Sequence, residues 1–167
     1  GDQMRAQIAY PSLNVKLIGG YAGLSDFADG ASHQSVEDIA VMRAVPNVTI
    51  VSPCDLTETK LAVRAIAAHE GPVFLRISRD AVSDLFGEDH PFEIGKGIVV
   101  REGSDVAIVA TGPVLKLAMQ AAEALAAQGV NARIIDMHTI KPLDCALIAE
   151  AAEETGAIVT VEEHNVF

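Results

Sequence analysis

The sequence contains no tryptophan, and aromatic residues make up only 4% of its 167 residues, although 50% of the residues are hydrophobic. The core must therefore be built from Ala, Val, Ile and Leu. Aliphatic cores of this kind are typical of α/β proteins, whose parallel strands are buried on both faces. The composition thus favours an α/β fold, and the length allows one medium domain or two small ones.

Basic residues are also scarce. The chain has 12 Lys and Arg against 23 Asp and Glu, which gives a formal net charge of −11. A strongly acidic protein repels nucleic acids and anionic membrane surfaces, so we expect neither as a partner. No apolar run approaches the about 20 residues that a membrane-spanning helix needs. The first residues are polar and lack the pattern of a signal peptide.

Cysteine is rare as well. The two cysteines, Cys54 and Cys145, lie far apart and lack the spacing of metal ligands. This pattern indicates reduced thiols in or near the core of a cytoplasmic protein.

Five histidines offer other possible metal ligands. His138 and His164 have glutamates nearby, but their spacing fits no standard metal cluster, so we expect surface or interface positions for both. His69 and His90 are expected at the surface. The sequence therefore assigns no metal ligand to this chain.

Short apolar runs alternate with helical patterns along the chain. The runs expected as strands are residues 14–18, 48–52, 73–77, 97–100, 106–110, 132–137 and 157–162. Helices are expected at residues 3–10, 35–45, 56–69, 114–128 and 144–155. Asp55 and Glu58 form a capping box at the start of the third of these helices. The alternation predicts βαβ units and parallel sheets.

Residues 80–96 interrupt this alternation. They are acidic, contain Gly and Pro and have no helical periodicity, so they predict a linker with at most a short hairpin strand. The fold class is therefore α/β, with two three-layer α/β units and mainly parallel sheets, at residues 1–90 and 91–167. Both units are expected to be incomplete, because the sequence starts within a helical pattern and stops just after a strand pattern.

The stretch from residue 29 to residue 47 combines a polar loop with a helix. The loop carries a carboxylate, Asp29, and an imidazole, His33. Ser35 followed by Asp38 predicts a capping-box variant at the start of a short, mostly buried helix. A titratable loop set on a rigid helix is a common way of building a binding site.

Three loops are expected at one edge of the first sheet, at residues 19–32, 52–55 and 78–80. Ligands of open parallel sheets bind at the carboxyl ends of the strands, where such loops meet. The third loop carries Arg79, whose guanidinium can bind phosphate or carboxylate with two hydrogen bonds. We therefore expect Asp29, His33 and Arg79 to converge.

Two parts of the sequence resemble the transketolases, which are thiamine diphosphate enzymes. The string DGASHQSVEDIAVMRAVPNVTIVSPCD at 29–55 resembles their pyrimidine-binding domain, and RISRD at 76–80 is similar to a short Ser-Arg segment that follows the next strand. The second half resembles the transketolase C-terminal domain, on the strings GKGIVVREGSDVAIVATG, ARIIDMHTIKPLD and VTVEEHN.

The resemblance implies transfer of a two-carbon ketol unit between sugar phosphates, as in the pentose phosphate pathway. His33 would lie beside the reactive thiazolium carbon, in contact with the cofactor and with a hydroxyl of the sugar donor, where it would assist proton movements. Asp29 would bind a substrate hydroxyl, and Arg79 the phosphate of the sugar. Thiamine diphosphate would supply the carbanion chemistry.

The chain also departs from the family pattern. The family has a further phosphate-binding histidine before its Asp-Gly motif, whereas this sequence has GGYAGLSDFADG there, with Tyr21 near that place. The family's glutamate that activates the cofactor, and the domain that binds the diphosphate and Mg²⁺, have no counterpart in these 167 residues. The resemblance therefore implies an N-terminal diphosphate-binding domain or subunit as partner, a homo-oligomer, and no turnover by this chain alone.

Two alternatives remain open from the sequence. The first is 1-deoxy-D-xylulose-5-phosphate synthase, which condenses pyruvate with glyceraldehyde phosphate and shares a related loop, although the VEDIAVMRA helix and RISRD favour transketolase. The β subunit of a 2-oxoacid dehydrogenase comes third among the thiamine diphosphate enzymes and is disfavoured, because the sequence of its corresponding loop differs from this one. The second alternative, from another functional class, is a non-catalytic oligomerisation or regulatory module.

Overall fold

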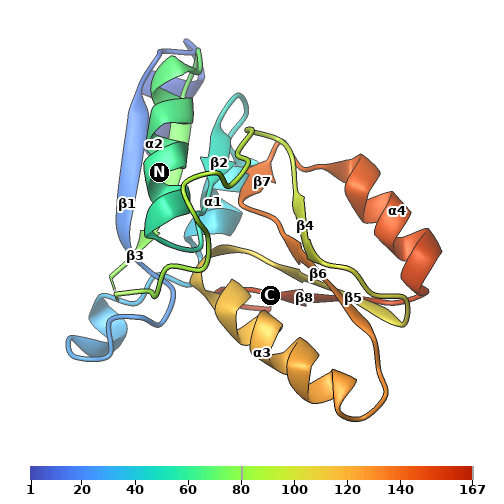
Figure 1. The fold of residues 1–167 in the computed structure, drawn as a ribbon. Helices are drawn as coiled ribbons and strands as arrows, with labels where there is room; N and C mark the ends of the chain where they lie inside the picture. The colour runs from blue at the N-terminus through green and yellow to red at the C-terminus, as the bar shows by residue number, and fades with distance from the viewer. Residues whose placement is uncertain (80, 167) are drawn as a thin grey trace.

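Two four-stranded sheets, joined by an extended segment, organise the chain (Figure 1). The structure is a computed structural model that describes residues 1–79 and 81–166. The first sheet has the order β1-β3-β2-β7 and the second the order β4-β6-β5-β8. The segment between them, residues 81–97, contains no helix or strand and confirms the predicted linker, without the short hairpin strand.

Three of the four strands in the first sheet run parallel to one another. Its strands are β1 (Lys16–Ala22), β3 (Val73–Ser78), β2 (Thr49–Val51) and β7 (Thr139–Lys141). Strand β3 lies between β1 and β2 and is parallel to both. Strand β7 comes from the second half of the sequence and pairs antiparallel with β2. The two halves of the chain are therefore joined through a shared sheet as well as through the linker.

Helices cover both faces of this sheet. A π-helical turn, η1 (Met4–Ala9), and α1 (Asp38–Ala44) lie on one face, where Phe74 and Ile50 pack with residues of both. Helix α2 (Leu56–Ala68) covers the other face through Ala62 and Ile66. Leu75 and Val51 are fully buried beneath it. Burial on both faces explains why β2 and the start of β3 are almost continuously apolar.

The second sheet has the same layered construction. Its strands are β4 (Ile98–Arg101), β6 (Ala132–Asp136), β5 (Val106–Ala110) and β8 (Ile158–Val161). Only β4 runs antiparallel to its neighbour. Helix α3 (Leu115–Ala126), which follows the 3₁₀ turn η3 (Gly112–Val114), covers one face, and α4 (Cys145–Thr155) covers the other. The predicted α/β class with two three-layer units is confirmed; the division at residue 90 stays a prediction.

The predicted cap of α2 at Asp55 is confirmed, because the Asp55 carboxylate accepts a hydrogen bond of 2.7 Å from the backbone N–H of Glu58. Oε2 of Glu58, however, accepts a hydrogen bond from the N–H of Cys54 rather than from that of Asp55, so the capping box is not complete. Helix α4 also has an aspartate cap, which is not among the features predicted from the sequence. The Asp144 carboxylate accepts one of 3.2 Å from the N–H of Leu147. Gly156 ends α4 with φ of 70°, a conformation in which glycine carries no steric penalty.

The structure corrects the predicted entry into α1. The helix begins at Asp38 rather than at residue 35, and no side chain caps it. The capping box of Ser35 and Asp38 is wrong, because Asp38 instead pairs with Arg76 from β3. The prediction of a mostly buried helix is also wrong, since only Ile39 is buried among its residues.

Strand β1 is longer than its apolar run predicts. Residues 19–22, expected as the start of a loop, continue the strand and pair with β3, with a register shift between Gly19 and Ala22. A side chain at Gly19 would lie 2.6 Å from the ring of Phe74. The glycine therefore permits the close approach of the two strands.

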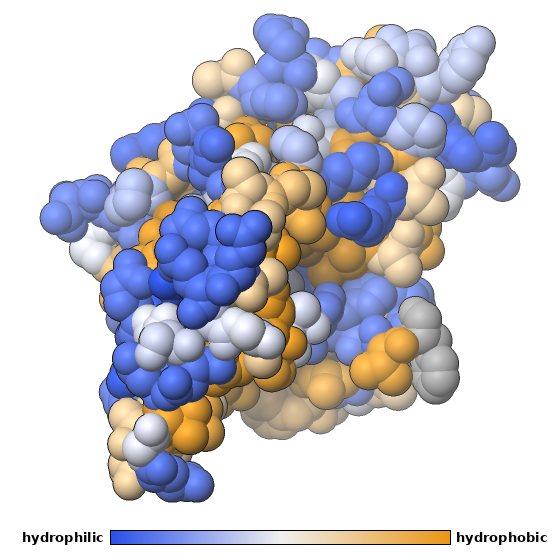
Figure 2. Space-filling model, turned by 90° about the vertical axis from the view of Figure 1, so that its right-hand side faces the viewer, coloured by the Kyte–Doolittle hydropathy of each residue, from blue (hydrophilic) through white to orange (hydrophobic). Residues whose placement is uncertain are grey.

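Figure 2 views the molecule from the side on which α4 lies in Figure 1, and shows hydrophilic side chains with hydrophobic ones reaching the surface between them. Within residues 1–79 and 81–166, no helix has the length and apolar character needed to cross a membrane.

Candidate functional site

The predicted site lies at the carboxyl edge of the first sheet, and Tyr21 is at its centre. Tyr21 is near the end of β1 and has φ of 60°, which is uncommon for a residue with a side chain. The ring centroid of Tyr21 lies 5.4 Å from that of His33, and the Arg79 guanidinium carbon lies 5.7 Å from the Tyr21 centroid. The structure thus brings His33 and Arg79 to the same aromatic side chain.

His33 follows a short 3₁₀ turn, η2 (Gly30–Ser32), and its side chain is exposed. Its Nδ1 lies 3.0 Å from Oγ of Ser32, and the same hydroxyl donates a hydrogen bond of 3.3 Å to the backbone carbonyl of Asp29. When the hydroxyl donates to that carbonyl, Nδ1 must carry the ring proton. Nε2 then presents a lone pair to the solvent, which is the arrangement a proton acceptor needs.

Asp29 lies at the start of this turn with its side chain exposed. Its backbone N–H donates a hydrogen bond of 3.3 Å to Oδ1 of Asp26. Asp29 is linked to His33 through Ser32. The structure brings His33 and Arg79 together at Tyr21, as predicted, but shows no direct contact of the Asp29 carboxylate with them among the described residues.

Arg79 directly follows β3 and is exposed. Its backbone N–H donates a hydrogen bond of 3.0 Å to Oγ of Ser25, which ties the end of β3 to the loop after β1. Its guanidinium lies over Tyr21, and no carboxylate of the described residues forms an ion pair with it. A cation held against an aromatic face, with its donors free, is suited to binding an anion.

A cleft with a volume of ≈ 250 Å³ opens beside this site, between the two units. Ser25 and Ser78 line it from the first unit, and Lys116 and Glu163 line it from the second. The site therefore adjoins a space to which both halves of the chain contribute.

Sequence reasoning missed Asp26, which organises the loop. Asp26 is 3% exposed, and its carboxylate accepts the hydrogen bond from Asp29. Its backbone carbonyl accepts a second hydrogen bond, of 3.2 Å, from Nε2 of Gln34. Asp26 holds the loop before the helix by bonds to the backbone, a pattern that short polar residues in loops favour. An aspartate three residues before Asp29 was the available signal.

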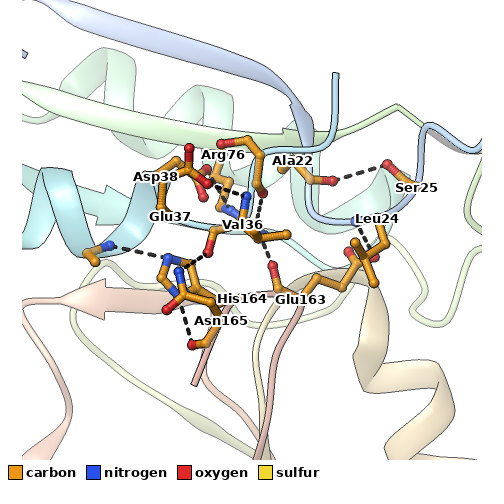
Figure 3. Close-up of polar contacts among 12 residues, drawn as sticks. Ala22, Leu24, Ser25, Val36, Glu37, Asp38, Arg76, Glu163, His164 and Asn165 are labelled. Carbon is orange, nitrogen blue, oxygen red and sulfur yellow. Dashed lines mark hydrogen bonds and ion pairs between the residues drawn. The ribbon is translucent and has the colours of Figure 1, made fainter. Parts of the chain in front are cut away.

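Sequence reasoning also missed Arg76, which joins the second unit to the site loop (Figure 3). Its Nε donates to Oδ2 of Asp38 at 2.8 Å. Its Nη2 donates to the backbone carbonyls of Ser35 at 3.3 Å and of Glu163 at 2.9 Å. The Arg76 side chain is 1% exposed. A buried guanidinium therefore sits between β3, the entry of α1 and the segment after β8.

Further bonds from that last segment complete the contact in Figure 3. The backbone N–H of Asn165 donates to the carbonyl of Val36 at 2.9 Å, and its side-chain amide donates to the same oxygen at 2.7 Å. The N–H of Leu24 donates to Oε1 of Glu163 at 3.3 Å. Residues 163–165 thus contact the segment that carries His33 on both sides of it, at Leu24 and at Val36.

Two histidines predicted at or near the surface are buried instead. His138, expected at a surface or interface, is 0% exposed and lies where the two units meet. The prediction for His90 is wrong, since its side chain is only 6% exposed because the linker folds back onto α2. Burial lowers the pKa of His138, as does the neighbouring His90, while Glu58 opposes them.

Comparison with protein families identifies both halves of the chain. Residues 1–84 match the family described as transketolase, pyrimidine binding domain, and residues 95–167 match transketolase, C-terminal domain. The chain belongs to the transketolase family. The predicted resemblance is thereby confirmed for both halves.

Two relatives and one solved structure show what kinds of protein the chain is similar to. The chain is 39% identical to the 6-deoxy-6-sulfo-D-fructose transketolase subunit SqwH of Clostridium sp. (strain MSTE9), over 99% of this chain and 51% of that protein. It is 37% identical to the 1-deoxy-D-xylulose-5-phosphate synthase of Symbiobacterium thermophilum, over 97% of this chain and 25% of that one. A solved structure of a split-gene transketolase, described as an inactive beta4 tetramer, is 44% identical and superposes with a TM-score of 0.92, over 99% of this chain and 53% of that chain.

The chain thus spans about half the length of the transketolase subunit that it matches. Its similarity to that subunit and to the split-gene tetramer shows that transketolases divided between chains, and assembled as oligomers, occur among its relatives.

Proposed function

We propose that this chain supplies the pyrimidine-binding and C-terminal domains of a thiamine-diphosphate-dependent transketolase, which moves a two-carbon ketol unit between sugar phosphates. The observation that carries the proposal is the placement of His33 and Arg79 against Tyr21 at the carboxyl edge of the first sheet. This edge is where parallel sheets bind their ligands. The family membership supplies the class of chemistry.

The roles follow from the chemistry of the exposed groups. His33 has its Nδ1 engaged by Ser32, which leaves Nε2 to accept or return the proton of a donor-sugar hydroxyl. Arg79 offers a guanidinium for the phosphate of the sugar. Asp29, exposed on the same loop, would accept a hydrogen bond from a substrate hydroxyl.

The residues present fit thiamine diphosphate in part. The exposed His33 ring can approach the thiazolium end of the cofactor, which supplies a carbanion at that ring when it is bound. The Nε2 atom of His33 has no hydrogen-bond partner among the residues that the structure describes, so it is open to a ligand. The diphosphate and its Mg²⁺ would be held by an N-terminal domain or subunit. We therefore propose that the chain turns over only with that partner, within an oligomer.

The test is reconstitution of activity. The chain is combined with a purified diphosphate-binding transketolase subunit, thiamine diphosphate and Mg²⁺, with xylulose 5-phosphate as donor and ribose 5-phosphate as acceptor. Formation of a seven-carbon ketose phosphate supports the proposal. No transfer by the assembled, cofactor-loaded complex contradicts it and favours the non-catalytic module, whereas product formation from pyruvate selects the deoxyxylulose phosphate synthase.

A matched pair of variants separates catalysis from folding. His33→Ala should lower kcat by about 100-fold or more, because general acid–base groups contribute about 10²–10⁴-fold. His69→Ala is the control, since His69 lies at the other end of the sheet and contacts Thr49 rather than the loop. A loss of thermal stability in His33→Ala, with kcat unchanged, would favour a purely structural histidine.

A further inference from the structure

A buried cluster of potential metal ligands lies where the two units meet, away from the site described above. Cys54, Glu58 and Asp136 are 1%, 0% and 0% exposed. Their ligand atoms, the thiol sulfur and one carboxylate oxygen from each acid, all lie within 4.8 Å of one another. Three acidic groups this close in a dry interior repel one another when ionised, so the cluster needs a compensating charge or protons.

Secondary structure holds each of the three groups. Cys54 lies in the turn between β2 and α2, and Glu58 follows four residues later in the first turn of α2. Asp136 ends β6 in the second unit. Asp55, which adjoins the cluster, is already saturated, because its carboxylate accepts hydrogen bonds from the N–H groups of Glu58, Leu85 and Phe86.

Two histidines border the same cluster. Nε2 of His90 lies 3.6 Å from Oε1 of Glu58, and the His90 ring stacks on Phe86 with centroids 3.7 Å apart. The His138 ring stacks on Phe92 at 4.1 Å, with its Nδ1 placed 2.9 Å from Oγ1 of Thr139. In both cases an aromatic ring fixes the imidazole, and Nε2 has no hydrogen-bond partner among the described residues.

Several polar atoms of this cluster lack hydrogen-bond partners, although Oε2 of Glu58 accepts a hydrogen bond of 2.6 Å from the backbone N–H of Cys54. Among the residues that the structure describes, five buried atoms accept or donate no hydrogen bond: Oε1 of Glu58, both carboxylate oxygens of Asp136, and Nε2 of His90 and of His138. Buried polar groups are almost always bonded, so a concentration of unpaired ones at one place points to a ligand-binding site. All five atoms are Lewis bases in the appropriate protonation state, which indicates a cation.

The electrostatics agree with a site for a cation. Burial and the nearby Glu58 and Asp55 carboxylates raise the pKa of Asp136 well above its usual value. Burial and the carboxylates of Asp136 and Glu58 raise the pKa of the Cys54 thiol. A bound dication reverses both effects, since it stabilises the thiolate and the carboxylates.

We propose that this cluster binds a divalent transition-metal ion, with Zn²⁺ as the ion that the donor set suits best. Cys54 Sγ, one oxygen each of Glu58 and Asp136, and Nε2 of His90 would make four ligands of the sulfur, oxygen and nitrogen types that zinc accepts. The thiolate disfavours Mg²⁺ and Ca²⁺, which prefer oxygen alone.

The ion would join three parts of the chain. Cys54 and Glu58 belong to the first unit, His90 to the linker and Asp136 to the second unit. A metal with these ligands would therefore fasten the linker and both units together. Its role would be structural, because four protein ligands leave no open coordination position.

The test uses the whole protein, freed of metal with a chelator and then incubated with Zn²⁺ or Co²⁺. After gel filtration, elemental analysis should find about one zinc per chain, and the cobalt form should show a thiolate-to-Co²⁺ charge-transfer absorption. Zinc should raise Tm, and a chelator should reverse that rise, since a ligand that binds only the folded state stabilises it.

Matched variants assign the ligands. Cys54→Ser should abolish the charge-transfer absorption, whereas Cys145→Ser, which alters the exposed cysteine, should leave it unchanged. Asp136→Asn keeps the shape of the side chain and should weaken zinc binding by about 10-fold or more, because even the loss of an outer partner of a metal ligand costs about that much.

The opposite results would overturn the proposal. They are a metal content near zero after incubation, a Tm that zinc does not move, or a cobalt spectrum that persists in Cys54→Ser. If Cys54→Ser does not fold, the wild-type metal content and the cobalt spectrum decide the question alone. Absence of metal would mean that the acidic groups share a proton instead.

Discussion

Replacing Arg76 by methionine tests how the two units are held together. Arg76 donates from one buried guanidinium to the carboxylate of Asp38 and to the carbonyls of Ser35 and Glu163. Methionine has a similar length and fills the space, so the change removes the charge and the three bonds rather than the packing. It leaves the Asp38 carboxylate, only 15% exposed, without its cation.

The magnitude follows from that geometry. Removing one partner of a buried ion pair costs about 3–5 kcal/mol, because the remaining charge stays desolvated and unpaired. Folded domains have about 5–15 kcal/mol of stability, so Arg76→Met should remove a large part of it. Arg76→Lys keeps a charge but not the planar fork of donors, and it should cost about 2 kcal/mol.

The assay is equilibrium unfolding in urea, followed by circular dichroism, with the free energy of unfolding extrapolated to water. Asp38→Asn serves as the partner variant and should cost about 2 kcal/mol by itself. The double variant Arg76→Met, Asp38→Asn should cost less than the sum of the two single changes, since no unpaired carboxylate remains.

Two results would refute the reasoning. One is a cost below about 1 kcal/mol for Arg76→Met, which is the value of an exposed pair. The other is additivity of the two single variants in the double variant, which would show that Arg76 and Asp38 act independently.

Three further predictions concern backbone and capping positions, all measured as the free energy of unfolding. Asp144→Ala should cost about 1 kcal/mol at neutral pH through loss of the cap of α4. Partial burial raises the pKa of Asp144, but bonds from the N–H groups of Leu147 and Gly97 lower it on balance. Because the folded-state pKa lies below the unfolded one, this stability is present above the unfolded pKa and is lost as the pH falls through the folded pKa. In Asp144→Asn, the free energy of unfolding should therefore fall less steeply as the pH is lowered, and an unchanged dependence on pH would contradict this. Gly103→Ala should cost about 3 kcal/mol, because its Cβ would lie 2.2 Å from the backbone of Ala132. The control Gly20→Ala has open space and should change stability by less than about 0.5 kcal/mol. Gly23→Ala should cost about 1–3 kcal/mol, since Gly23 has φ of 68° and faces the Glu163 side chain at 2.5 Å; a neutral result would mean that the loop tolerates displacement of Glu163.

Local signals predicted most of the secondary structure. The apolar runs of β2, β3, β5 and β6, and the cap at Asp55, lie where the sequence places them. These features depend on residues within a few positions of one another, so periodicity and capping chemistry contain the information. Strand β7 escaped notice because a three-residue strand has no readable period, and its partner β2 lies about 90 residues away.

The candidate site was predicted in part for the same reason. The loop motif located Asp29 and His33, and the strand order placed Arg79 on the same edge. The role of Tyr21 as the common neighbour of His33 and Arg79 could not be predicted, because it depends on a positive φ at the end of β1. Roles in binding and catalysis stay predictions until the reconstituted enzyme is measured.

The sequence by itself determined the α/β class, the order of most elements and the family, since each is recorded in local patterns or in continuous motifs. Only the tertiary structure decided which side chains became partners. Asp38 suited a helix cap, but it pairs with Arg76 across 38 positions. Cys54 and Asp136, 82 positions apart, meet in one buried cluster that neither local pattern predicts. The physical reason is that burial removes water as a partner, so the choice of partner passes to whatever groups the fold brings within reach.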